Sequence, residues 1–175
     1  IPTTYGKEQI DMLLNTFKKG VNALGLTCGA AKGDLKLTPK GCMIGEIAAR
    51  LSGGYMSGWT FPYASGIDLT EQLLRIALNM EPTIDINSDF IPCTQYSAEG
   101  AWLSIPGKVN ALKGIDKAKA IPKVKEVFIR SQKSDEVVFP QNNVEKCGNI
   151  IASESSYKKA QDIKKKILYK NKIYQ

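Results

Sequence analysis

Hydrophobic positions near the start of the chain recur at helical spacing. Six apolar residues share one face of the predicted helix: Ile10, Leu13, Leu14, Phe17, Val21 and Leu24. Their i, i+3, i+4 pattern predicts an amphipathic helix, which Gly25 ends. A second helix is expected from Asp68 to Asn79, because Asp68 and Glu71 form a capping-box pattern at its start. The residues on its inward face are Leu69, Leu73, Ile76, Ala77 and Met80.

Between these two helices, a pair of short aliphatic segments predicts a β-hairpin. Residues 33–37 and 42–48 are separated by the sequence Thr-Pro-Lys-Gly. A short loop with Pro and Gly between two such segments is typical of a hairpin. Pro39 suits the second position of a type I turn, and Gly41 suits the left-handed position that follows it.

The expected register places charged residues on one face of this hairpin. It pairs Thr38 with Cys42, Lys36 with Ile44 and Asp34 with Glu46. Side chains alternate along a strand. One face is therefore expected to carry Lys32, Asp34, Lys36, Ile44, Glu46 and Ala48, with Arg50 at its end. The opposite face, which points into a core, is expected to carry Leu35, Leu37, Met43 and Ile47.

The carboxylates of Asp34 and Glu46 are expected to face each other across the two strands. Such a pair is unfavourable unless a cation lies between or beside the two groups. One interpretation is a solvated face with cross-strand ion pairs. The other is a site for magnesium and phosphate, in which carboxylate oxygens hold the ion and Lys and Arg bind phosphate oxygens. Spacing alone does not decide between them.

The remainder of the chain alternates predicted strands and helices. Strands are expected at 94–105, 124–130 and 149–152, with a short helix at 114–120. A final helix is expected after Ser155 or Ser156, with an apolar stripe of Tyr157, Ala160, Ile163 and Ile167. This order predicts a mixed α+β architecture. The expected division is 1–80, a linker at 81–93 that contains two prolines, and a small subdomain at 94–175.

Residues 52–66 form a predicted loop rich in glycine, serine and aromatic residues. Its rings are Tyr55, Trp59, Phe61 and Tyr63. They suit the wall of a substrate pocket, but rings in such a loop more often pack it against the protein. Both interpretations remain open at this point.

Composition excludes several classes of chemistry. The chain of 175 residues has no histidine, which removes Ser-His-Asp and Cys-His catalysis, and its four cysteines lack the C-x-x-C spacing of zinc sites. Reduced thiols and a cytoplasmic location are expected. No stretch has the roughly 20 apolar residues of a membrane span, so no membrane partner is expected. The chain begins at Ile1 without an initiator methionine, which fits a fragment or a processed protein.

Positive charge is concentrated at the end of the chain. Of the net charge of +7, residues 155–175 carry seven lysines against one aspartate. A basic amphipathic helix can bind nucleic acid or an anionic membrane. Residues 155–175 contain no arginine, and a single aromatic residue, Tyr169, lies among the lysines, which is fewer than a strand-binding groove requires. A solvated outer helix face is the simpler interpretation, so nucleic acid is not the expected partner.

The hairpin and its surroundings resemble a known family. The sequence GLTCGAAKGDLKLTPKGCMIGEIAARLSGGYMSGWTFPYASGIDL is similar to the C-terminal half of the ATP-grasp fold. The resemblance is to the branch with biotin carboxylase, the carbamoyl phosphate synthase large subunit and carboxylate-amine ligases. A looser likeness to the small closing subdomain of these enzymes continues through GIDKAKAIPKVKEV and CGNIIASESSYKKA.

The resemblance implies a role for each charged residue of the hairpin. Asp34 and Glu46 match the family's acidic metal ligands, and Arg50 matches the arginine of its Glu-x-Asn-x-Arg signature. Arg50 would hold an acyl phosphate or a substrate carboxylate. The other implied contributors are Lys32 as a helper and the backbone of Ser52, Gly53 and Gly54 as a loop that approaches phosphate or substrate.

Three positions depart from the family pattern. Ala48 stands where the signature has Asn, so one usual metal ligand is missing. Asp34 is shorter than the commoner Glu, and Lys32 stands where some relatives have histidine. The remaining pair can hold at least one magnesium, whereas a full two-metal site is in doubt. Mn²⁺ is a suitable substitute for Mg²⁺.

The implied chemistry is ligation through an acyl phosphate. ATP would phosphorylate a small carboxylate or bicarbonate, and an amine would then displace the phosphate. The family also needs an N-terminal half that grips the phosphates, so this chain alone is expected to be inactive. Surface left open by that missing half favours homodimer formation. The alternatives are a degenerate, non-catalytic assembly domain and a basic nucleic-acid-binding module.

Overall fold

The computed structural model describes residues 1–85, 88, 91–103, 105–142 and 144–170. The chain divides into two compact units. The first, which we call the hairpin unit, comprises Thr3–Gly53 and Ile67–Pro92. The second, which we call the sheet unit, comprises Ile1–Pro2, Gly54–Gly66 and Cys93–Gln175. Among the described residues, no helix combines the length and apolar character needed to cross a bilayer.

The hairpin unit contains two helices and two strands. They are α1 (Lys7–Ala23), β1 (Lys32–Thr38), β2 (Gly41–Ala48) and α3 (Leu69–Ala77). The predicted first helix is confirmed, and Gly25 follows it with a left-handed φ of 69°. The predicted cap of α3 is also confirmed, since the Asp68 carboxylate accepts hydrogen bonds from the backbone N–H groups of Thr70 and Glu71.

The strands β1 and β2 pair antiparallel, as the turn chemistry predicts. Gly41 has the expected positive φ of 112°, and Asp34 is paired with Glu46. The predicted register near the turn is wrong. Thr38 pairs with Gly41 and Lys36 pairs with Met43, one residue earlier than expected.

A bulge at Gly45 accounts for the one-residue difference between the register near the turn and the register at Asp34. Leu35 pairs with Ile44 and Asp34 pairs with Glu46, which leaves Gly45 without a partner in the ladder. A bulge of one residue changes which side chains share a face. The expectation that Met43 points into the core and Ile44 lies on the charged face is therefore wrong: Met43 is 58% exposed, and Ile44 contacts α1.

Helix α1 packs closely on the uncharged face of the hairpin. A methyl group at Gly20 would lie 2.5 Å from Ile47 Cδ1 and 2.7 Å from Ile44 Cδ1. At Gly33, a methyl group would lie 2.5 Å from the ring of Phe17. Glycine at these two positions therefore allows the helix and strands to approach, and the charged residues are left on the open face.

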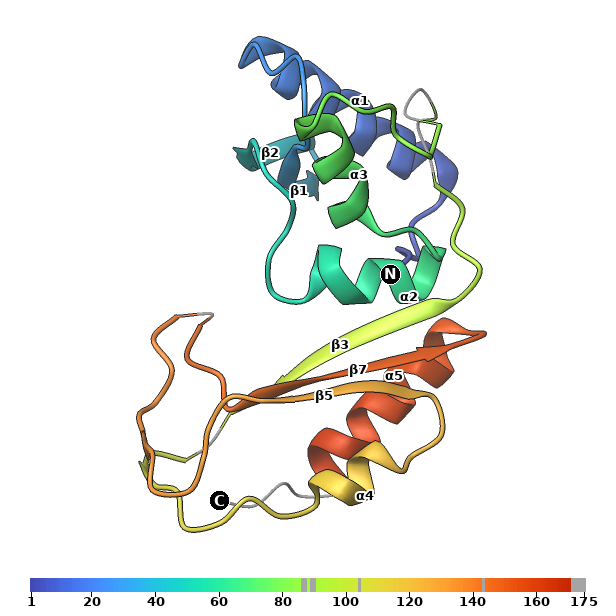
Figure 1. Cartoon of the computed structure of the whole chain (residues 1–175). Coiled ribbons are helices and arrows are strands. Elements are labelled where there is room, and N and C mark those ends of the chain that lie inside the picture. Colours follow the sequence, from blue (N-terminus) through green and yellow to red (C-terminus); the bar gives the residue numbers. More distant parts are fainter. Residues whose placement is uncertain (86–87, 89–90, 104, 143, 171–175) are drawn as a thin grey trace. The chain divides into compact units, whose positions relative to one another are not determined.

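The sheet unit is built on three antiparallel strands in the order β3-β7-β5, which Figure 1 shows side by side. Their bounds are β3 (Tyr96–Trp102), β5 (Val124–Ile129) and β7 (Gly148–Glu154). Helices α4 (Ile115–Lys119) and α5 (Tyr157–Lys165) lie on one face of this sheet (Figure 1). The short π-helix η2 (Lys166–Lys170) continues α5, and β4 (Gly107–Lys108) pairs with β6 (Glu136–Val137).

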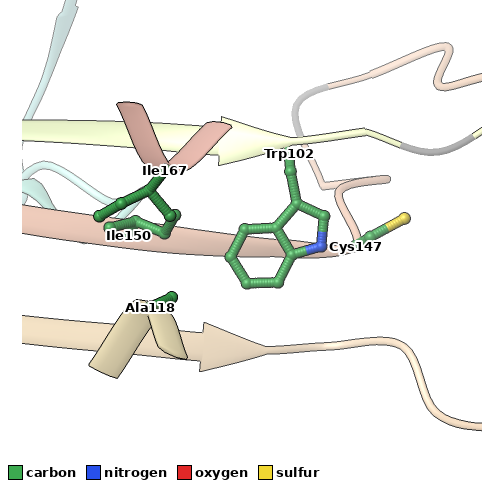
Figure 2. Close-up of a cluster of buried hydrophobic side chains, with 5 residues drawn as sticks. All are labelled: Trp102, Ala118, Cys147, Ile150 and Ile167. Atoms are coloured by element: carbon green, nitrogen blue, oxygen red, sulfur yellow. The ribbon is translucent and has the colours of Figure 1, made fainter. Parts of the chain in front are cut away.

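The core of the sheet unit lies between the three strands and α4 and α5. Its buried members, drawn in Figure 2, are Trp102, Ala118, Cys147, Ile150 and Ile167. The predicted stripe of α5 is confirmed in part. Ala160 and Ile167 are buried, whereas Tyr157 is 46% exposed, and Ser156 rather than Ser155 caps the helix by accepting a hydrogen bond from Lys159 N.

Residues 54–66 belong to the sheet unit, although they follow the hairpin in sequence. They form η1 (Met56–Thr60) and α2 (Phe61–Ser65). The carbonyl oxygen of Ala64 accepts hydrogen bonds from the backbone N–H groups of Thr94 and Gln95. This division differs from the boundaries at 80 and 94 drawn from the sequence, because backbone hydrogen bonds between distant segments are invisible in a linear pattern. Residues 86, 87, 89 and 90 of the predicted linker lie outside the described residues.

Candidate metal and phosphate site

The charged face of the hairpin brings two carboxylates together. Asp34 in β1 and Glu46 in β2 are cross-strand partners, and their side chains are 64% and 52% exposed. Both strands present their charged residues to solvent because α1 covers the opposite face. Two negative charges at directly opposed positions need a nearby cation.

Lys32 supplies that cation in the structure. Its ammonium lies 2.5 Å from Asp34 Oδ2 and 3.3 Å from Glu46 Oε1, and its side chain is only 19% exposed. The hydrogen bond to Asp34 is the main cause that raises the pKa of Lys32 above its usual value. The amine is therefore firmly protonated at neutral pH and bridges the two strands.

Arg50 lies beside the same pair. Its Nη2 is 3.8 Å from Glu46 Oε1, and its Nη1 donates a hydrogen bond to the Leu51 carbonyl oxygen at 3.1 Å. Arg50 N donates to the carbonyl oxygen of Ala48, which forms a tight bend just after β2. The Arg50 side chain is 58% exposed, so an oxyanion can reach its planar set of N–H donors.

The predicted glycine loop follows this bend. Ser52 and Gly53 belong to the hairpin unit, whereas Gly54 is the first residue of the next segment of the sheet unit. Gly54 has a φ of 64°, a left-handed conformation that favours glycine. A methyl group would meet no atom within 4 Å at either glycine, so the backbone there is open to a ligand.

The donor set fits one magnesium ion. Within the part of the chain that the structure describes, no third Asp, Glu, Cys or His joins Asp34 and Glu46 to complete a metal cluster. Magnesium is commonly held by one or two carboxylates together with phosphate oxygens and water. Two exposed carboxylates are therefore sufficient for an ion that arrives with a phosphate group, and Ala48 offers no further ligand.

The aromatic residues after the glycine loop pack against the sheet unit. The ring of Tyr55 stacks on Phe128 with 4.2 Å between ring centroids, and Trp59 meets both rings edge-on. Phe128 lies in β5 and was not singled out from the sequence. Nothing in the sequence indicates a partner more than 60 residues away. The rings hold η1 on the sheet, as the simpler interpretation predicts.

Tyr63 makes a second link that the sequence does not reveal. Its hydroxyl donates a hydrogen bond to Glu126 Oε1 at 2.5 Å, and Lys125 Nζ lies 5.7 Å from its ring centroid. Burial, followed by the hydrogen bond to Glu126, raises the pKa of Tyr63 to about 12. This pair joins α2 to β5.

Comparisons with known proteins agree with the fold. A family model described as L-amino acid ligase C-terminal domain 2 matches residues 101–170. The chain is similar to an L-amino acid ligase from Bacillus licheniformis, with a TM-score of 0.83 and 20% identity over 95% of this chain and 41% of that one. Among curated proteins, no sequence matches the chain.

Two further solved structures extend the likeness. Phosphoribosylglycinamide synthetase from Anaerococcus prevotii has a TM-score of 0.77 and 18% identity, covering 98% of this chain and 43% of that one. Biotin carboxylase from Campylobacter jejuni, solved as a complex with beta-gamma-ATP, has a TM-score of 0.61 and 19% identity, covering 95% of this chain and 36% of that one. The chain thus spans less than half the length of each of these structures.

The chain has the fold of the C-terminal half of the ATP-grasp enzymes, with antiparallel sheets flanked by helices in a mixed α/β arrangement. Residues 101–170 are the part of this fold that the model of the L-amino acid ligase C-terminal domain 2 matches. The predicted fold and the predicted resemblance are confirmed.

Proposed function

We propose that the chain is the C-terminal part of an ATP-dependent ligase that joins a carboxylate to an amine, and that residues 32–54 hold its metal and phosphate groups. The observation that carries this proposal is the cross-strand pairing of Asp34 with Glu46, beside two basic side chains. Hard oxygen ligands next to Lys and Arg suit a magnesium ion bound to phosphate. The ATP-grasp fold supports the same assignment.

Each residue of the site has a separate task in this proposal. Asp34 and Glu46 would hold the magnesium ion, which when bound neutralises charge on the phosphates of ATP. The planar fork of Arg50 would bind the acyl phosphate or the substrate carboxylate. The open backbone at Gly53 and Gly54 would let a phosphate or substrate approach closely.

The reaction consists of two displacements. In the first, a carboxylate oxygen attacks the γ-phosphorus of ATP, the bond from phosphorus to the ADP oxygen breaks, and an acyl phosphate forms. In the second, the amine nitrogen attacks the acyl carbon, the carbon–oxygen bond to phosphate breaks, and the nitrogen loses a proton. Arg50 favours both steps by stabilising negative charge on the transferred group.

The surface of the hairpin unit supports the view that the active enzyme is longer. Several large apolar side chains of this unit are between about half and two thirds exposed: Met12, Leu24, Met43, Leu74, Leu78 and Met80. Exposed apolar surface of this kind marks an interaction site. We propose that a further half of the enzyme covers it and supplies the rest of the ATP site, so the chain alone is inactive.

One observation favours a second candidate. The ammonium of Lys32 already forms ion pairs with both carboxylates, as in a non-catalytic domain that keeps the fold for assembly alone. Such a domain would have no need for a metal. Metal binding at Asp34 and Glu46 therefore distinguishes the two candidates.

The experiment is a titration of the isotope-labelled chain with Mn²⁺, followed by NMR. We expect the amide signals around Asp34 and Glu46 to broaden first and to recover when excess Mg²⁺ is added. The double variant Asp34→Asn with Glu46→Gln should lose this selective broadening. The matched control, Asp11→Asn with Glu71→Gln, removes two exposed acids of the same unit and should keep it. Broadening that is unchanged in the first double variant would reject the proposed site.

A further inference from the structure

The position of Lys32 is unusual for a lysine on an exposed strand. Its ammonium is within 3.3 Å of both carboxylates, where a bridging cation would lie. Lysine side chains on a surface usually extend into water, yet only 19% of this one is exposed. The ammonium therefore occupies the space between Asp34 and Glu46.

The register explains how Lys32 reaches this position. Lys32 is the cross-strand partner of Ala48, so their Cβ atoms lie side by side on the charged face. The small side chain of Ala48 leaves room for the lysine stem and contributes no oxygen of its own. The Lys32–Ala48 pair therefore adds a positive charge to the charged face and adds no oxygen ligand for a metal ion.

We infer that Lys32 is a tethered cation of this site, which a divalent ion must displace, and that the site consequently selects a metal ion that arrives with a polyphosphate. The inference deepens the proposed function and rests on it. A free divalent ion must enter against a positive charge that is already paired. An ion carried by a polyphosphate brings new oxyanions, which give the displaced ammonium of Lys32 a partner.

Simple electrostatics gives opposite signs for the two ligands. Removing the ammonium leaves Asp34 without this partner and Glu46 with only its longer ion pair to Arg50, so the two carboxylates should bind a free divalent ion more tightly. A metal–polyphosphate complex is anionic overall, so the same two carboxylates repel it unless Lys32 is present. A pair of unit charges about 4 Å apart in water corresponds to a factor of about five, and a divalent ion doubles that interaction energy, so a change of at least about fivefold is expected in each direction.

The experiment measures both ligands on wild type and Lys32→Met. This substitution keeps most of the stem that packs beside Ala48 and removes the charge. The probes are Mn²⁺ alone and Mn²⁺ with inorganic tripolyphosphate, each titrated by NMR line broadening at residues 34 and 46. We expect Lys32→Met to bind Mn²⁺ at least about fivefold more tightly and Mn²⁺–tripolyphosphate at least about fivefold more weakly than wild type.

Two further variants show whether an effect of Lys32→Met comes from the lost charge at this position or from a change in folding. Lys32→Gln also removes the charge and should behave as Lys32→Met does. Lys40→Met removes one positive charge at the exposed turn of the same hairpin. It should change neither affinity by more than about twofold, because water and salt largely screen exposed charges that are separated by most of the length of the hairpin. Circular dichroism checks that each variant is folded.

The outcomes separate this inference from the proposed function. If wild type and Lys32→Met bind free Mn²⁺ equally well at Asp34 and Glu46, the metal site exists but the ammonium of Lys32 does not compete with the ion. A tripolyphosphate complex that binds both proteins equally would also overturn the inference. If neither protein shows binding that depends on Asp34 and Glu46, the proposed metal site itself is wrong and the inference falls with it.

Discussion

The hydroxyl group of Tyr63 in α2 donates a hydrogen bond to the carboxylate of Glu126 in β5, with 2.5 Å between the two oxygens. This link joins the segment that follows the glycine loop to the three-stranded sheet. The carbonyl oxygen of the same tyrosine accepts a hydrogen bond from Ser153 Oγ in β7. Tyr63 therefore attaches α2 to two strands of the sheet.

We predict that Tyr63→Phe lowers the free energy of unfolding by about 1 kcal/mol at neutral pH, the usual contribution of one hydrogen bond. Chemical denaturation measures this change. Tyr157→Phe is the matched control, because that ring is 46% exposed and carries the same hydroxyl group. An equal loss in both variants would mean that the Glu126 hydrogen bond contributes nothing specific.

The same tyrosine predicts a pH dependence. The folded protein raises the pKa of Tyr63 from 10 to about 12, so the folded state holds this proton more tightly than the unfolded state does. Its contribution to stability is complete below pH 10 and is lost as pH rises toward 12. Wild type should therefore lose more stability than Tyr63→Phe across that interval, and parallel unfolding curves for the two proteins would contradict the assignment.

A further prediction concerns the cap of α3. The carboxylate of Asp68 accepts hydrogen bonds from Thr70 N at 2.8 Å and Glu71 N at 3.1 Å. Asp68→Ala should lower the free energy of unfolding by about 1 kcal/mol, because both N–H groups lose their acceptor. Asp68→Asn keeps an oxygen at the cap and should cost only a few tenths of a kcal/mol. Thermal and chemical unfolding of the three proteins measure these differences, and equal losses would exclude capping as the cause.

The next prediction concerns Gly148 at the start of β7. A methyl group there would collide with the ring of Trp102 and with the carbonyl oxygen of Phe128. Gly148→Ala should destabilise the sheet unit by about 3 kcal/mol, because neither the buried ring nor the backbone can move freely. Gly58→Ala is the control, since no atom lies within 4 Å of its added methyl group. A loss below about 1 kcal/mol at Gly148 would show that the core repacks more easily than its density suggests.

The last prediction tests the role proposed for Arg50 in the longer ligase of which this chain is proposed to be a part. Arg50→Lys keeps the charge but loses the planar fork that binds carboxylate or phosphate at two points. We expect kcat/KM for ADP formation to fall by about 100-fold, as for the loss of one well-placed donor. Arg130→Lys, a conservative change at an exposed arginine, should leave kcat/KM within about twofold of wild type. A similarly small effect at Arg50 would remove it from the proposed site.

Local chemistry made much of the fold predictable. The apolar period of α1, the cap at Asp68 and the turn at Pro39 and Gly41 each depend on residues close in sequence. The pairing of Asp34 with Glu46 was also predicted, although the register between them and the turn was wrong. Near the turn, each residue of β1 pairs with a β2 residue one position earlier than predicted. The unpaired Gly45 then shifts the register by one residue, which restores the predicted pairing of Asp34 with Glu46.

The sequence by itself determined the helices, the hairpin and the presence of opposed carboxylates, because each follows from backbone preferences and alternation over a few residues. Only the tertiary structure decided that Ile44 packs on α1, that Tyr63 reaches Glu126, and that the ammonium of Lys32 lies between Asp34 and Glu46. These contacts depend on a bulge, on side-chain rotamers and on segments distant in the chain. Their energies arise only once the elements have packed, so no local pattern encodes them.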